Sequence, residues 1–486
     1  MLRYTTPRLR DVLFFGIFIA AILLGPRMLN MDGDLPRHLA IGKFVLQGNP
    51  PPTEDIFSHT RTGVPFAPHK WLSGVLFYLA YLANGEIGIV LLSALALALT
   101  FTLIYEDRSK HAGLNLTVMI LVVLGAGVSS LHWIARPHLF TMLLLSVWIV
   151  LTNKLACGEN IRWWIFPTLM LLWNNIHGEY ISGLLVTVSY LGGWLWDFLT
   201  RDEKPASDVG KKLGLALGVS LLVSILNPIS LRAWTTVTSW MGNQYLMEKT
   251  QETVPPDFLN SDFYILLVML GLSLFVLGVK RGAIPTGQAI LLAGFTLMVL
   301  TSARNVHIYG VAAPFVLAAP LAEILNFPFL KKLEERIRTL EAPLKGYAYP
   351  VTVFMLGILL LNTTPLGKAQ RFSPSYFPVQ AVEWLNSNPQ KGNMFNPFDW
   401  GGYISFTAWP QNKVFIDSQG DVYGEAFIRE YERVANLDEG WESVLEKYRV
   451  TWALVPTKWL LADALLDNGW SEVYRDDTAL ILVKGQ

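Results

Sequence analysis

The stretch MDGDLPRHLAIGKFVLQGNPPPTEDIFSHTRTGVPFAPHKW, residues 31–71, decides how the chain is organised. It is polar and lies between an apolar N-terminal segment and a long apolar body. Ordinary connections between helices have a median of about 4–6 residues, so this one is unusually long. Its carboxylate, histidine and basic side chains run from Asp32 to Lys70 and predict a functional loop that the rest of the chain presents.

The composition on either side of this loop sets the class of protein. Hydrophobic residues make up 52% of the 486 residues and charged residues 16%, and the mean hydropathy is +0.37. A soluble chain of this length is less apolar, so we expect a polytopic α-helical membrane protein. The formal net charge is zero, whereas nucleic-acid binding needs a basic excess. The single cysteine, Cys157, cannot form an internal disulfide.

The charges of the loops predict the topology. Three arginines precede the first apolar run, and such charges stay in the cytoplasm. No small-residue cleavage site follows this run, so we expect a retained helix rather than a signal peptide. The later loops alternate in charge only if residues 71–84 do not cross the membrane, which suits an interfacial or re-entrant helix. This gives about eleven transmembrane helices, with the first loop and the C-terminus outside.

The composition changes near residue 363. Residues 1–363 are predicted to form the transmembrane domain, with residues 31–70 as its first external loop, and residues 364–486 an external α/β domain. In the latter, the β-rich runs KVFID, VTWALVP and ALILVK alternate with the helical runs VQAVEWLN, EAFIREYERVA and WESVLEKY. We expect a binding or lid role for this domain, and a strand-to-helix turn at FDWGGY. Asp417 and Asp421 are a distinctive pair.

Unusual polar residues collect at the predicted external helix ends, in the sequences ARPH, WNNIHG and SARNVH. Charge at membrane depth is costly and therefore hints at function. We expect a ring of side chains facing a cavity under the first loop: Arg136, His138, Asn175, His177, Arg304 and His307. In the alternative interpretation, the two arginines snorkel to lipid headgroups and His177 is a satisfied interfacial histidine.

Asp32 and Asp34 open the first loop and are the candidate catalytic carboxylates. Asp34 stands before Leu35 and Pro36, a setting that fits a helix N-cap. This leaves Asp32 without a structural role and favours it as the base. An Asp-x-Asp spacing also occurs in many ordinary loops, where both residues are solvated charges.

The chain resembles the bacterial multispanning glycosyltransferases of the GT-C type. The resemblance rests on the first loop, on ARPHLFT and WNNIHGEY, and on FDWGGYISF and KVFIDSQGDVYG near the C-terminus. It extends more distantly to the lipid-linked mannosyltransferases, aminoarabinose transferases and oligosaccharyltransferases. It implies an inverting transfer, on the external face, from a polyprenyl-phosphate sugar. It also implies that an acidic residue of the first loop, by position Asp32 or Asp34, acts as base or holds a metal.

The residues agree with this implication. A lipid-phosphate donor needs cationic groups at the outer helix ends, so the candidate phosphate-binding residues are Arg136, His138, His177, Arg304 and His307. An acceptor glycan, lipid or protein needs a general base. Candidates for acceptor or loop contacts are His38, Glu54, Asp55, His59 and His69. A divalent metal such as Mg²⁺ or Mn²⁺ at Asp32 and Asp34 stays an option, although no tight ligand spacing is present.

Two other classes of function stay open. The first is a transporter or flippase of a lipid-linked saccharide, for which we expect broken helices at mid-membrane and internal repeats. The second is a non-catalytic membrane scaffold whose external domain binds a partner. The chain has no phosphate-binding loop and no G-x-G-x-x-G fingerprint after a strand, so a nucleotide-sugar donor is unsupported.

Overall fold

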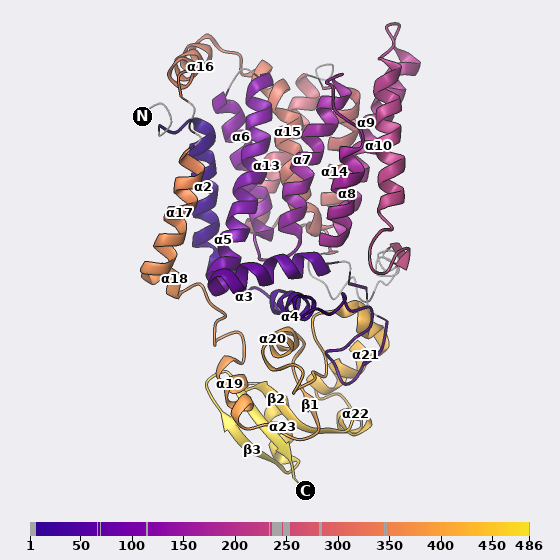
Figure 1. Ribbon diagram of the computed structural model, residues 1–486, viewed down its shortest axis with the longest axis vertical. Helices are drawn as coiled ribbons and strands as arrows, with labels where there is room; N and C mark the ends of the chain where they lie inside the picture. The colour runs from indigo at the N-terminus through magenta and orange to yellow at the C-terminus, as the bar shows by residue number, and fades with distance from the viewer. Residues whose placement is uncertain are drawn as a thin grey trace.

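The computed structural model is a bundle of roughly parallel helices with a small α/β domain at one end and helix α16 (Pro328–Glu341) at the other (Figure 1). It describes residues 6–65, 67–68, 70–112, 115–232, 234–235, 245, 253–280, 284–344, 346 and 348–485. The first loop lies between the bundle and the α/β domain, so it contacts both.

Each apolar segment that the sequence predicted is a helix in the structure. The helices of the bundle are α2 (Leu9–Leu23), α5 (Trp71–Ala112), α6 (Asn115–Ser129), α7 (His138–Ala156), α8 (Ile165–Ile176), α9 (Ile181–Thr200), α10 (Ser207–Val223), α13 (Tyr264–Val279), α14 (Thr286–Thr301), α15 (Val306–Ile324) and α17 (Ala348–Thr363). Among the described residues, five helical segments are long and apolar enough to cross a membrane unaided. The chain is therefore a multi-pass membrane protein, and the number of about eleven crossings stays a prediction.

Helix α5 breaks where the sequence predicted the end of an interfacial segment. Asn84 and Gly85 leave the helical conformation, and Gly85 has a φ of +56°, which glycine adopts at little cost. The part before the break runs across the end of the bundle, and the part after it runs along the bundle (Figure 1). Residues 71–84 thus form a separate segment at the level of the helix ends.

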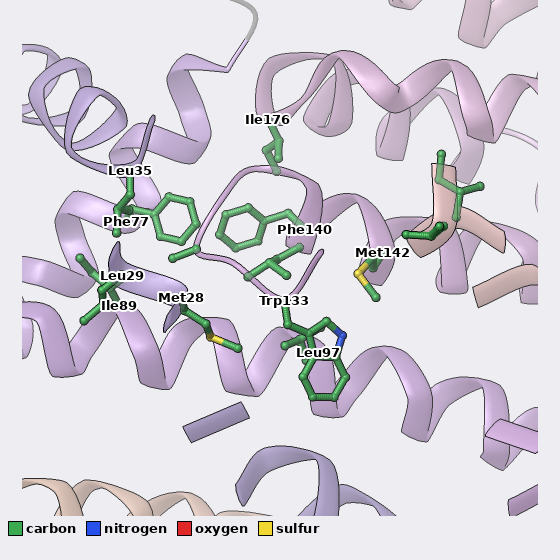
Figure 2. Close-up of a cluster of buried hydrophobic side chains, with 14 of the residues drawn as sticks. Met28, Leu29, Leu35, Phe77, Ile89, Leu97, Trp133, Phe140, Met142 and Ile176 are labelled. Carbon is green, nitrogen blue, oxygen red and sulfur yellow. The ribbon is translucent and has the colours of Figure 1, made fainter. Parts of the chain in front are cut away.

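The short helix α3 (Gly25–Asn30) lies directly before the first loop, and helix α4 (Asp34–Leu46) is near its start. Apolar side chains under it form a buried cluster in which Met28, Leu35 and Phe77 contact the bundle (Figure 2). The rings of Phe77 and Phe140 lie 5.2 Å apart between centroids. Burial of side chains of this size contributes about 1.5–3 kcal/mol each, so this cluster fixes the start of the loop at the depth of the helix ends.

The C-terminal domain carries a four-stranded sheet in the order β1-β2-β4-β3. Strand β1 (Asn393–Phe395) is parallel to β2 (Val450–Pro456), and the pairs β2 with β4 (Ala479–Lys484) and β4 with β3 (Trp470–Arg475) are antiparallel. Its helices are α18 (Pro365–Lys368), α19 (Val379–Ser387), α20 (Phe398–Ala408), α21 (Gly420–Ala435), α22 (Trp441–Lys447) and α23 (Leu460–Asp467). The predicted strands VTWALVP and ALILVK are β2 and β4. KVFID makes only an isolated bridge, between Val414 and Ser58 of the first loop.

The FDWGGY segment is not the turn that the sequence predicted, because it opens helix α20. Its glycines serve close packing instead. A Cβ atom on Gly402 would stand 2.4 Å from the carbonyl oxygen of Gly33, and one on Gly33 would stand 2.3 Å from the carbonyl oxygen of Asp399. Helices α4 and α20 therefore approach at a distance that only glycine allows.

The predicted orientation can be tested with single cysteines, but not at every loop position, because Ser58 is fully buried. Thr53 and Ser471 are exposed, in the first loop and in β3. Cysteines at these two positions should react with an impermeant thiol reagent in intact cells. The native Cys157, which is exposed between α7 and α8, should react only after permeabilisation. Labelling of Cys157 in intact cells, or of only one introduced cysteine, would contradict the predicted topology.

Candidate functional site

The start of helix α4 differs from the sequence-based expectation. Gly33 is the N-cap, no side chain caps the helix, and Asp34 is its first residue. The backbone N–H of Asp34 donates to Oδ1 of Asp32 at 2.8 Å. The prediction that Asp34 is the N-cap is therefore wrong, because the short Asp32 side chain binds the N–H group two residues ahead. The structural role belongs to Asp32, and the reason for preferring it as the base is lost.

Arg136 lies between these two carboxylates. Its Nη2 atom is 2.8 Å from Oδ2 of Asp32 and 3.2 Å from Oδ2 of Asp34. The backbone N–H of the preceding residue, Ala135, donates to the carbonyl oxygen of Met28 at 3.1 Å. The connection that carries Arg136 is thus attached to helix α3, directly before the first loop.

Most of the predicted ring of polar side chains lines one pocket at the ends of the helices. The pocket holds about 350 Å³ of empty space, part of it open to solvent. Its walls are Asp34, Lys70, His132, Arg136, Pro137, His138, His177, Glu179, Arg304 and His307. Asn175 is not among them, because its side chain accepts a hydrogen bond from Nε1 of Trp71 at 2.8 Å and thereby holds the start of α5.

Glu179 organises the far side of the pocket. One of its carboxylate oxygens, Oε2, is 2.8 Å from Nε2 of His307 and 3.3 Å from Nδ1 of His177. The other, Oε1, is 3.8 Å from Nε of Arg304. Burial raises the pKa of Glu179, but the two histidines outweigh burial and hold this pKa well below its usual range. An ionised Glu179 thus places three predicted phosphate ligands around one carboxylate.

The two loop carboxylates differ in acidity. Burial raises the pKa of Asp32 to about 6, and the charge of Arg136 offsets only part of this effect. Burial also acts on Asp34, but Arg136 and then Lys70 outweigh it and lower the pKa of Asp34 to about 2. Environments that push two neighbouring pKa values apart are a feature of acid–base sites. Asp34 is the more acidic member of the pair and the one that lines the pocket.

His38 lies one helical turn after Asp34 on α4 and is only 3% exposed. Burial, followed by the charge of Lys70, lowers the pKa of His38 to about 3, so the ring is neutral. Neither ring nitrogen has a hydrogen-bond partner among the residues that the structure describes. The nearby carboxylate of Asp34 acts to raise the pKa of His38, but burial outweighs it.

The other predicted loop contacts serve the structure of the loop. Buried Asp55 accepts hydrogen bonds from the hydroxyl and the backbone N–H of Ser58, at 2.6 and 3.1 Å. The Nε2 atom of His59 is 2.8 Å from the carbonyl oxygen of Met394 in β1. Glu54 is exposed and makes a backbone bridge to Pro65. None of these three lines the pocket, and His69 lies outside the described residues.

The C-terminal domain is joined to the site through a buried ion pair. The Nε atom of Arg37, in α4, is 2.7 Å from Oδ2 of Asp417, and both side chains are at most 2% exposed. If the C-terminal domain has the expected binding or lid role, the membrane domain should bind a donor without residues 365–486. This stays a prediction, because deleting those residues removes both Asp417 and helix α20, which packs against Arg37. Asp421 belongs to α21, and its side chain is not described.

Four residues near the pair of carboxylates were absent from the sequence-based site: Lys70, His132, Glu179 and Asp399. Asp399 comes from α20, and burial followed by the charge of Asp34 raises the pKa of Asp399. Lys70 could have been found, because it ends the polar loop directly before the interfacial segment. Glu179 and Asp399 depend on tertiary contacts that no spacing in the sequence indicates.

Comparisons with known proteins find a likeness in structure only. No sequence family matches the chain, and no curated protein matches it. The oligosaccharyltransferase AglB from Archaeoglobus fulgidus, in complex with an inhibitory peptide and a dolichol-phosphate, is 11% identical with a TM-score of 0.55. That match covers 91% of this chain and 69% of AglB.

ArnT from Cupriavidus metallidurans, bound to undecaprenyl phosphate, is 12% identical with a TM-score of 0.53. The match covers 98% of this chain and 99% of ArnT. At such identities the likeness concerns the fold, which does not by itself determine function. The chain thus shares the fold of two GT-C glycosyltransferases, and the resemblance found in the sequence is confirmed at the level of the fold.

Proposed function

We propose that the chain transfers a sugar from a polyprenyl-phosphate-linked donor to an acceptor at the external membrane surface, with inversion at the sugar. The observation that supports this most directly is the composition of one pocket. The carboxylate of Asp34 faces the same space as Lys70, Arg136 and Arg304, at the ends of apolar helices. A membrane-embedded donor carries its phosphate at this depth.

Each side of the pocket has a role in this reaction. The cations Lys70, Arg136 and Arg304, with His138, His177 and His307 beside them, bind the donor phosphate. Asp34 accepts the proton of the acceptor's X–H group as the acceptor atom bonds to the anomeric carbon of the sugar. The bond from that carbon to the phosphate oxygen breaks, and the polyprenyl phosphate leaves as an anion. The same cations stabilise the negative charge that develops on the leaving oxygen.

A transporter is less well supported. Its polar groups would lie near the membrane midplane, whereas the polar groups of this pocket come from helix ends. His138 is the first residue of α7, His177 follows α8, and Arg304 precedes α15. A scaffold would have no need for a buried, mostly cationic pocket next to a pair of carboxylates.

The phosphate-binding part can be measured with undecaprenyl phosphate and protein in lipid nanodiscs. Lys70→Met and Arg304→Met should each weaken binding about tenfold or more, because a hydrogen bond to a charged group contributes about 1.5–3 kcal/mol. Arg304→Lys should also weaken binding, since lysine lacks the planar fork. The matched control is Arg371→Met, which removes an exposed cation outside the pocket.

Equal binding by the wild-type chain and all of these variants would contradict the proposed phosphate site and return Arg304 to a lipid-anchoring role. Transfer itself is measured separately, as release of undecaprenyl phosphate from sugar-loaded carrier lipid extracted from membranes. Binding of the carrier without any release of it would favour a transporter or a scaffold.

A further inference from the structure

Two carboxylates beside a phosphate site are typical ligands of a divalent cation. Asp32 and Asp34 are the residues that the sequence offered for this role. Among the residues that the structure describes, no three His, Cys, Asp or Glu side chains are grouped as metal ligands. The oxygen atoms of Asp32 and Asp34 instead make hydrogen bonds and ion pairs with protein groups.

Both oxygens of Asp32 are engaged within the protein. Oδ1 accepts a hydrogen bond from the backbone N–H of Asp34 at 2.8 Å, and Oδ2 lies 2.8 Å from Nη2 of Arg136. Oδ2 of Asp34 shares the same Nη2 atom at 3.2 Å, and the Asp34 side chain is also hydrogen-bonded to Ser418. A metal ion bound by both carboxylates would have to displace the guanidinium group from this position.

The backbone that carries Arg136 is held in place on both sides. Its backbone N–H donates to the carbonyl oxygen of Ile134 at 2.8 Å, and the neighbouring Ala135 is held by Met28. Trp133 anchors the same connection, because it is 4% exposed and its Nε1 donates to Ser129 at 3.0 Å. The connection between α6 and α7 thus fixes the backbone from which the guanidinium reaches the two carboxylates.

The fixed charges of the pocket also match those of a metal site. Arg136 and Lys70 both line the pocket, and both lower the pKa of Asp34. Together they place two positive charges beside the carboxylate that faces the donor, which is the charge of one divalent ion. Guanidinium can contact carboxylates on one edge and a phosphate on another, since it has five N–H donors.

We propose that the guanidinium of Arg136 takes the place of a divalent cation, linking Asp32 and Asp34 to the donor phosphate, so that the site neither binds nor needs a metal. The link to the phosphate rests on the proposed function, whereas the exclusion of the metal rests only on the contacts around Arg136.

The test measures binding of Mn²⁺ by electron paramagnetic resonance, in which bound Mn²⁺ is detected as a loss of the six-line spectrum of the free ion. Chelator-washed wild-type protein in nanodiscs should bind no more Mn²⁺ than the Asp34→Asn variant does. This should hold with or without undecaprenyl phosphate. Arg136→Gln frees both carboxylates and should gain a Mn²⁺ site, at least tenfold tighter than any binding by the wild type. Arg136→Lys keeps a cation there and should not gain one.

The matched control is Arg136→Gln combined with Asp34→Asn, which should lose the gained site. Mn²⁺ binding by the wild type that disappears in Asp34→Asn would overturn the proposal. A folded Arg136→Gln protein without a Mn²⁺ site would overturn it too. If Arg136→Gln does not fold, the proposal is decided by comparing Mn²⁺ binding of the wild type with that of Asp34→Asn. Mn²⁺ binding measured without carrier lipid involves no sugar donor. It therefore tests the proposal about Arg136 even if the chain does not transfer a sugar.

Discussion

Replacing Asp34 by asparagine should lower sugar transfer by about 10²–10⁴-fold, the usual contribution of a general base. Asparagine keeps the shape of the side chain but cannot take up the acceptor's proton. Asp34 has no capping role in α4, and Arg136 keeps its ion pair with Asp32, so the variant should fold, with a moderately lower thermal midpoint because the contact of Asp34 with Arg136 is weakened. The measurement is release of undecaprenyl phosphate under single-turnover conditions, with carrier binding measured in parallel.

Asp32→Asn is the matched comparison for this experiment. Its amide oxygen can still accept the N–H of Asp34, but the ion pair with Arg136 is lost. We therefore expect Asp32→Asn to lose less transfer activity than Asp34→Asn, and to change the binding of the carrier lipid. An inactive, well-folded Asp32→Asn beside an active Asp34→Asn would show that the two roles are reversed. Full activity in both variants would refute the base mechanism for this loop.

The second large effect should come from the ion pair between the first loop and the C-terminal domain. Removing one partner of a buried pair costs about 3–5 kcal/mol, and Asp55, whose Oδ1 is 3.9 Å from Nη2 of Arg37, is too far away to replace the 2.7 Å contact with Asp417. Asp417→Asn should therefore lower the thermal midpoint strongly and expose the connection after α17 to protease. The double variant Arg37→Met with Asp417→Leu removes both charges and should recover part of the lost stability, but not the part that comes from the contact of Arg37 with Asp55.

The control for this prediction is an exposed pair of the same chemistry. Arg475 and Glu472 are 2.7 Å apart, with side chains 44% and 38% exposed, and such pairs contribute about 0–1 kcal/mol. Glu472→Gln should thus leave the thermal midpoint almost unchanged. If Asp417→Asn is as stable as Glu472→Gln, the ion pair does not hold the domain in place.

Several parts of the structure could be predicted because their causes are local. The mean hydropathy, the loop charges and the fourteen-residue length of segment 71–84 act over short distances, and they located the helices and the separate first part of α5. The pocket residues Arg136, His177 and Arg304 were found because polar residues at helix ends are conspicuous in an apolar chain.

The remainder depends on contacts between distant parts of the chain. The structural role of Asp32 was assigned to Asp34 because two carboxylates one residue apart can each bind a nearby N–H, and only backbone geometry decides between them. The glycines of FDWGGY were assigned to a turn, since the sequence cannot show that Gly402 lies against Gly33. Glu179 followed an apolar helix without any pattern that marked it as the partner of His307.

The hydrogen bonds between the first loop and the C-terminal domain also set an order of events during synthesis. The hydroxyl of Thr60 donates to the carbonyl oxygen of Phe415, 355 residues further along the chain. At about 5–20 residues per second, a ribosome needs roughly 20–70 s to cover such a distance. The segment that carries Asp32 and Asp34 is therefore among the first to leave the ribosome and among the last to reach its final shape. A chain that stops before residue 415 has every helix of the bundle in place but lacks the surface on which this segment closes.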